Sequence, residues 1–194
     1  MNAARGPAGI IELMSARYLA AGLLLAGLCL ADVRDCACNA ADPAKFAARE
    51  CGLCREAEKQ AAGTGVFFLK DVNPRKPNRW LALPRAHFEG AQVLLGMSPA
   101  ERTAFWTAAI AKARELWGDK WALAMNGDGA RTQCHSHVHI GRLLDGVEID
   151  NFVVVSGPSE IPVPRDGTGL WIHPQGDKLH VHLGEQIAET VLLR

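Results

Sequence analysis

The sequence lacks a net charge, has a single tyrosine, and contains no apolar run long enough to cross a membrane. Its 21 Lys and Arg residues balance 21 Asp and Glu residues, which argues against a nucleic-acid-binding protein that depends on bulk positive charge. The one tyrosine, Tyr18, lies in an N-terminal leader, so the mature chain has no tyrosine for acid–base chemistry. Internal repeats and low-complexity tracts are also absent, and 194 residues are enough for one domain with its own core.

The longest apolar run, YLAAGLLLAGLCLA at residues 18–31, is shorter than the ~20 residues that a spanning helix needs. Arg17 precedes this run and the small residue Ala31 ends it, a pattern typical of an export signal. We therefore expect residues 1–31 to be a signal peptide or an N-terminal anchor to the inner membrane. The mature protein would lie in the periplasm or cell envelope, with a Cys-rich lead-in at 32–62 and a main domain at 63–194.

Five cysteines follow the leader, and the first four are spaced C-x-C-x12-C-x2-C. In an exported protein this spacing favours two disulfides, whose pairing the sequence leaves open, among Cys36, Cys38, Cys51 and Cys54. In a reducing compartment the same spacing would suit a zinc ion. Cys134 would then be the unpaired thiol, with the role of a small buried hydrophobic residue.

Hydrophobic alternation predicts strands separated by turns and one main helix. Strand patterns occur at 65–71, 79–84, 121–126, 131–141 and 151–155, and a final hairpin at 169–183. The main helix is predicted over 98–117, because Ser98 and Glu101 match a capping box, Pro99 takes the first helical position and Gly118 follows the last turn. These elements indicate the α+β class with an antiparallel sheet, and the tryptophans are expected in its core.

The segment RTQCHSHVHIG, residues 131–141, places His135, His137 and His139 at every second position. On a strand these three side chains would share one face, and a polar stripe of this kind suits either metal ligation or phosphoryl chemistry. The glycine-rich loop just upstream decides between them, because glycines let the backbone approach an anion and its polar side chains supply hydrogen-bond donors. These donors, which favour phosphate, are Asn126, Arg131, Thr132 and Gln133.

The run of histidines resembles the signature of the histidine-triad superfamily, in which three histidines alternate with hydrophobic residues. The segment LALPRAHFEG is similar to the superfamily strand that ends in Pro-x-x-His, and this gives His87 the role of contacting a nucleotide or phosphate. The sequences NGDGARTQ, HVHI and GVFFLKD resemble the CDP-diacylglycerol pyrophosphatase branch, an enzyme of the bacterial envelope. The resemblance implies a histidine-triad-like catalytic domain at 63–194 that hydrolyses CDP-diacylglycerol to phosphatidate and CMP.

The resemblance implies that His137, the middle histidine of the three, is the nucleophile. A neutral imidazole is available near pH 7, and a covalent intermediate divides the displacement into two steps. A backbone carbonyl that accepts from its far ring nitrogen would fix the tautomer. His135 and His139 would hold phosphoryl oxygens or orient the nucleophile. The four donors of the loop would stabilise the developing charge. No cofactor and no metal are expected at this site.

Two alternatives stay open. One is a soluble hydrolase of nucleotide phosphoramidates or dinucleoside polyphosphates from the same superfamily, and the other is a secreted metal-binding domain. The resemblance also leaves membrane association and a homodimer open. Outside the triad, His173, His180 and His182 suggest a half-exposed hairpin, residues that line the mouth of the site, or a metal site. A basic group is expected in a solvated turn or against anionic lipid, and consists of Lys70, Arg75, Lys76 and Arg79.

Overall fold

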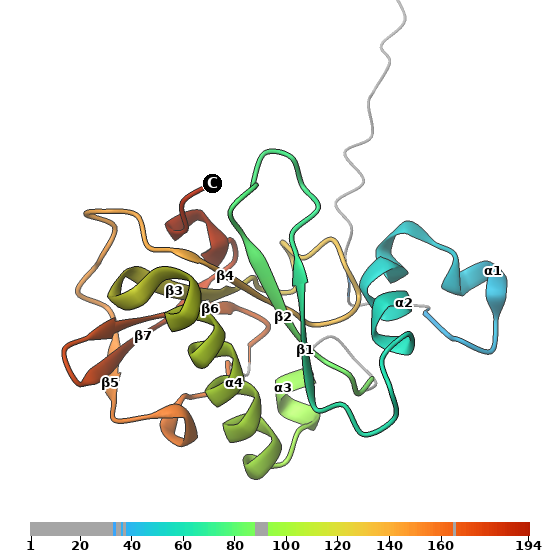
Figure 1. Cartoon of the computed structure of the whole chain (residues 1–194), viewed down its shortest axis with the longest axis horizontal. Helices are drawn as coiled ribbons and strands as arrows, with labels where there is room; N and C mark the ends of the chain where they lie inside the picture. The colour runs from blue at the N-terminus through green and yellow to red at the C-terminus, as the bar shows by residue number, and fades with distance from the viewer. Residues whose placement is uncertain (1–32, 34–35, 37, 88–92, 165) are drawn as a thin grey trace, which may run out of the picture.

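The computed structural model describes residues 33, 36, 38–87, 93–164 and 166–194, and the predicted leader lies outside them. It is an α+β protein with a seven-stranded antiparallel sheet in the order β1-β2-β4-β3-β6-β7-β5 (Figure 1). The predicted class, antiparallel sheet and single main helix are confirmed. The strands are β1 (Val66–Lys70), β2 (Trp80–Pro84), β3 (Trp121–Met125), β4 (Val138–Arg142), β5 (Val153–Val155), β6 (Gly169–Gln175) and β7 (Lys178–Glu185).

The helical elements are mostly short and lie around this sheet. They are α1 (Pro43–Phe46), η2 (Arg49–Cys51), α2 (Gly52–Glu58), α3 (Val93–Gly96), α4 (Pro99–Trp117), η3 (Gly118–Lys120), η4 (Pro158–Glu160) and η5 (Ala188–Val191). The sequence pattern did not predict α3, and it left the segment of η5 open between a strand and a short helix, because one turn of helix is too short to display a period of 3.6 residues.

The main helix α4 packs across one side of the sheet, in front of the strands in Figure 1. Ser98 accepts from the backbone N–H of Glu101 while the Glu101 carboxylate accepts from that of Ser98, so the predicted capping box is present. Trp106 and Ile110 on α4 pack with alternate strand residues such as Val138 and Ile140, which form the larger core. Three tryptophans are fully buried, as expected for core residues, namely Trp106, Trp121 and Trp171.

On the opposite side of the sheet, several short segments pack in place of one long helix. Ala57 of α2 packs over Leu81 and Leu83 at one end, and η5 covers Ala124 and Trp171 near the middle. One row of directly paired residues crosses four strands on this side, because His139 pairs with Ala124, Ala124 with Trp171, and Trp171 with His182. Side chains of directly paired residues project from the same side of a sheet. His139 of β4 and His182 of β7 therefore share this side, about three strand spacings or roughly 14 Å apart.

The predicted number of disulfides, two, is confirmed, but the prediction of which cysteines form them is wrong for Cys54 and Cys134. The disulfides join Cys36 to Cys134 and Cys38 to Cys51, and the free, buried thiol is Cys54 rather than Cys134. Cys134 reaches the lead-in because the loop that precedes β4 lies against η2, where the Cys134 N–H donates to the Glu50 carbonyl at 2.8 Å. Spacing along the chain carries no information about this contact. Disulfides fit an exported protein.

Within the part of the chain that the structure describes, no helix is long and apolar enough to span a membrane. The segment that the sequence predicts as a signal peptide or anchor falls outside that part.

Candidate active site

A cleft of about 770 Å³ lies on the side of the sheet away from α4, within the size range of small-molecule sites. The lead-in from η2 to α2 forms one wall, the β1–β2 loop a second, and the glycine-rich loop after β3 a third. The structure brings six of the eight predicted site residues together in its lining, namely Asn126, Arg131, Thr132, Gln133, His137 and His139.

His137 is held by its own backbone. Its ring nitrogen Nδ1 lies 2.9 Å from the carbonyl oxygen of His135, and since a carbonyl can only accept, Nδ1 carries the proton. The lone pair of the neutral ring is then on Nε2. Burial lowers the pKa of His137, so the imidazole stays neutral below the usual histidine range. The sequence analysis expected a backbone carbonyl to fix the tautomer of His137, and the His135 carbonyl does so.

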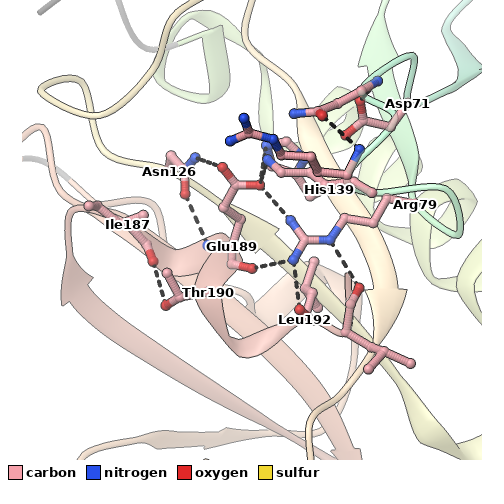
Figure 2. Close-up of polar contacts among 12 residues, drawn as sticks. Asp71, Arg79, Asn126, His139, Ile187, Glu189, Thr190 and Leu192 are labelled. Atoms are coloured by element: carbon pink, nitrogen blue, oxygen red, sulfur yellow. Dashed lines mark hydrogen bonds and ion pairs between the residues drawn. The ribbon is translucent and has the colours of Figure 1, made fainter. Parts of the chain in front are cut away.

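His139 lies on β4 between β2 and β3, edge-on to the His137 ring with 4.9 Å between ring centroids. Its Nε2 is 3.7 Å from Oε2 of Glu189, a residue of η5. Asn126 fixes that carboxylate from the other side, because its Nδ2 donates to Glu189 Oε1 at 3.2 Å while its Oδ1 accepts from the Glu189 N–H at 3.0 Å (Figure 2). Glu189 thus connects the end of β3 to the histidines.

Two basic residues complete the setting of Glu189. Arg79 donates to its Oε2 at 2.5 Å and to the Leu192 carbonyl at 2.6 Å, while Lys76 forms a second ion pair with Oε2 (Figure 2). Burial alone would raise the pKa of Glu189, but His139, Lys76 and Arg79 outweigh it and lower the pKa to about 2. The carboxylate therefore stays ionised at every physiological pH.

Sequence reasoning missed Glu189 and misplaced Arg79. The interpretation of Arg79 as part of a solvated turn is wrong, because its side chain is only 2% exposed. Glu189 is separated from Arg79 by 110 residues. It stands in a tail whose strand or helix character the pattern does not decide, so no local signal could have identified it.

Two of the predicted phosphate donors in the glycine-rich loop, Arg131 and Gln133, form hydrogen bonds with the protein itself. Arg131 is buried, and its guanidinium donates to Asp128 at 2.7 Å and to the Ser136 hydroxyl at 2.6 Å. Gln133 accepts from the Leu53 N–H at 3.1 Å and donates to the Arg49 carbonyl at 3.2 Å, which ties the loop to the lead-in. Thr132 is exposed at the cleft. Arg131 and Gln133 therefore hold the cleft walls in place.

His135 and His87 lie outside the cleft lining. The strand begins only at Val138, so His135 stands in a bend, where its Nε2 donates to the Pro84 carbonyl at 2.7 Å. Its ring meets that of His87 at 4.8 Å between centroids, and His87 contacts Glu58 at 2.9 Å. The tether of the neighbouring Cys134 to the lead-in explains why the alternation does not continue back to His135.

The same pair lies near the free thiol. Ligand atoms of Cys54, His87 and His135 fall within 4.8 Å of one another, which are the residue types of a metal site. Burial raises the pKa of the Cys54 thiol, and the thiolate is the form that binds metals. The hydrogen bond from Nε2 of His135 to the Pro84 carbonyl leaves the lone pair of that ring on Nδ1, so the protonated Cys54 thiol is the feature that disfavours an ion here.

The cleft has an excess of positive charge. Its lining includes three acidic residues, Glu56, Asp71 and Glu189, and five basic ones, Arg49, Arg55, Lys70, Lys76 and Arg131. An anionic ligand would gain from this excess because the walls are partly desolvated. A comparison of the sequence with models of known protein families finds no match.

Proposed function

We propose that this protein hydrolyses the pyrophosphate bond of a nucleotide through a nucleotidyl-histidine intermediate, and that CDP-diacylglycerol is the substrate. The setting of His137 carries the proposal. A tautomer fixed by a carbonyl at 2.9 Å leaves the Nε2 lone pair available in a cleft lined by an excess of basic residues. An activated nucleophile next to anion-binding groups is the arrangement that covalent phosphoryl transfer needs.

In the first step Nε2 of His137 attacks the phosphorus that carries the cytidine. An N–P bond forms, the bond from this phosphorus to the bridging oxygen breaks, and phosphatidate leaves with the electron pair on that oxygen. In the second step water attacks the same phosphorus and the N–P bond breaks with its electron pair returning to Nε2. CMP is released, and the proton of the water passes to solvent.

The other residues of the cleft have distinct roles in this scheme. Thr132, exposed in the lining, and Lys76, which lines the cleft beside Glu189, donate to phosphoryl oxygens. His139 packs edge-on against the nucleophile and keeps its ring in place. Asn126 and Glu189 in turn hold His139. Arg131 and Gln133 act through the shape of the loop, so they are positioning residues, as are His135 and His87 behind the nucleophile.

The lipid substrate is supported by the apolar part of the cleft. Leu53 of α2, Leu69 of β1 and Val72 of the β1–β2 loop are in its lining, and Val72 is 96% exposed. A large apolar side chain at the rim of a charged cleft suits an amphiphile, whose diphosphate lies inside while its acyl chains remain with the membrane. The predicted export of the chain agrees with an envelope lipid as substrate.

The decisive experiment compares substrates and then captures the intermediate. The full-length protein, with disulfides intact, is incubated with CDP-diacylglycerol in mixed micelles and, separately, with a soluble dinucleoside polyphosphate and a nucleotide phosphoramidate. We expect CMP to form fastest from the lipid. Faster release of nucleotide from the soluble compounds would favour the soluble-hydrolase alternative. Rapid denaturation during turnover should leave cytidylate bound to His137, detectable by mass spectrometry, and turnover without any such adduct would contradict the mechanism.

A further inference from the structure

A second histidine cluster lies at the other end of the same side of the sheet. It consists of His173 on β6, His180 and His182 on β7, and Glu148 from the β4–β5 connection, and is called here the β6–β7 cluster. Nε2 of His173 lies 3.4 Å from Nε2 of His182 and 3.4 Å from Oε1 of Glu148. The expected half-exposed hairpin is therefore wrong for two of its histidines, since His173 and His182 are buried.

The hydrogen bonds of His173 leave a conflict at its Nε2. Nδ1 lies 3.2 Å from the carbonyl oxygen of Pro174, and because a carbonyl only accepts, Nδ1 carries the proton of the neutral ring. Nε2 then directs a lone pair toward the Glu148 carboxylate, which is also only an acceptor when ionised. Two acceptors at this distance repel each other unless a positive centre lies between them. A cation shared by both residues removes the conflict.

We propose that the β6–β7 cluster binds a divalent transition-metal ion of the zinc type, with His173 Nε2, His182 Nε2 and the Glu148 carboxylate as its ligands. All three ligand atoms lie within 4.8 Å of one another. Two ligands at about 2.0–2.1 Å from one tetrahedral ion are about 3.4 Å apart, which agrees with the two separations of 3.4 Å. Two imidazoles with one carboxylate select zinc-like ions over Mg²⁺ and Ca²⁺, which prefer oxygen ligands.

Aromatic stacking holds the ligands in place before any ion binds. The His182 ring lies on Trp171 with 3.5 Å between centroids and an interplanar angle of 1°, and the Trp171 indole N–H donates to Glu185. The His180 ring lies on Phe152 at 4.0 Å, and its Nδ1 contacts Oε1 of Glu148 at 2.5 Å. Such partners fix the orientation of a ligand and raise metal affinity, so His180 positions the carboxylate.

The accessibility of the site suits exchange with solvent. His173 and His182 are 3% and 1% exposed, whereas Glu148 is 39% exposed. An ion can therefore enter past Glu148 and keep a water molecule as its fourth ligand on that side. Because Glu148 belongs to the connection between β4 and β5, a bound ion would fasten this connection to the final hairpin. The site is separate from the cleft, so hydrolysis and metal binding can fail independently.

The test uses the full-length protein, stripped with a chelator and dialysed against Zn²⁺ without reductant. We expect one ion per chain by elemental analysis and a rise in the thermal midpoint of unfolding. Glu148→Gln should weaken Zn²⁺ binding by at least about tenfold, and it keeps the buried histidines, so it should fold. Asp150→Asn, an exposed carboxylate in the same connection, is the matched control and should bind Zn²⁺ as the wild type does.

Three results would overturn the proposal. The first is that no stoichiometric Zn²⁺ is retained, and the second is that Glu148→Gln binds as tightly as Asp150→Asn. The third is that Cys54→Ser, rather than Glu148→Gln, removes the ion, which would place it beside His87 and His135. Replacing Zn²⁺ by Co²⁺ gives an independent measurement, because a ligand set of nitrogen and oxygen lacks the intense charge-transfer band of a thiolate.

Discussion

Both histidine clusters contain histidines at alternate positions of the sequence, His137 and His139 in one and His180 and His182 in the other, but the two clusters lie in opposite chemical environments. His137 and His139 face a carboxylate, Glu189, whose charge is already neutralised by Arg79 and Lys76. His173 and His182 face Glu148, which has only histidines around it and is 39% exposed. The first carboxylate already has two cationic partners, while the second, among the described residues, is paired with histidines, His173 and His180. The difference between the anion-binding cleft and the proposed cation site therefore lies in the charged partners of Glu189 and Glu148, and not in the histidines themselves.

The largest effect should come from the cleft. His137→Ala removes the proposed nucleophile and is expected to reduce CMP release by on the order of 10³-fold or more, measured with CDP-diacylglycerol in micelles. Zn²⁺ binding by the β6–β7 cluster should be unchanged in this variant. The exposed residue Glu115 on α4, on the far side of the sheet, provides the control Glu115→Gln, which should retain full activity. If the His137→Ala protein folds and releases CMP at the wild-type rate, His137 is not the nucleophile and the two clusters do not differ in function as proposed.

The next effect sharpens the comparison of the two carboxylates. Glu189→Gln leaves the buried Arg79 guanidinium without its counter-charge, so we expect a loss of about 3 kcal/mol in the free energy of unfolding. Glu148→Gln in metal-free protein should change it by less than about 0.5 kcal/mol, since the Glu148 side chain is 39% exposed and pairs with no buried permanent cation. Urea titrations of both variants provide the measurement. Equal losses of unfolding free energy in the two variants would mean that Glu189 is no more important than Glu148 as a counter-charge.

The smallest effect is a dependence of stability on pH. Burial, the largest cause, lowers the pKa of His135 to about 4, below the ~6.5 of an unfolded histidine. Between these values the unfolded chain binds a proton that the folded chain does not. Stability should therefore fall as the pH decreases from 6.5 toward 4, by up to about 1.4 kcal/mol per pH unit for this histidine. In metal-free protein His135→Gln should make the decline less steep, and an unchanged slope would show that His135 titrates normally.

Local rules predicted much of the fold because they act over a few residues. The capping box at Ser98 and Glu101 determined where α4 begins, and alternation located the strands to within a few residues. The prediction was poorer for the triad, where alternation suggested one strand through His135 and the strand begins at Val138. The difference comes from the Cys36–Cys134 disulfide, a constraint that no local pattern expresses.

For the candidate site, sequence reasoning found the residues that lie close together along the chain. Asn126, His137 and His139 belong to one loop and the strand β4 that follows it, so their spacing and residue types were informative. Glu189 and the wall formed by α2 were not found, because η5 and the lead-in approach the cleft only through packing. The position of Glu148 opposite His173 depends in the same way on a long connection.

The sequence by itself determined the class of fold, the main helix and the alternation that turns His137 and His139 to one side of β4. These properties follow from backbone geometry with a period of two or 3.6 residues. Only the tertiary structure decided which cysteines pair and which carboxylate stands before each group of histidines. Charges and thiols act on whatever lies a few ångströms away in space, and that neighbour can come from a distant segment, as Glu189 does for Lys76, 113 residues apart.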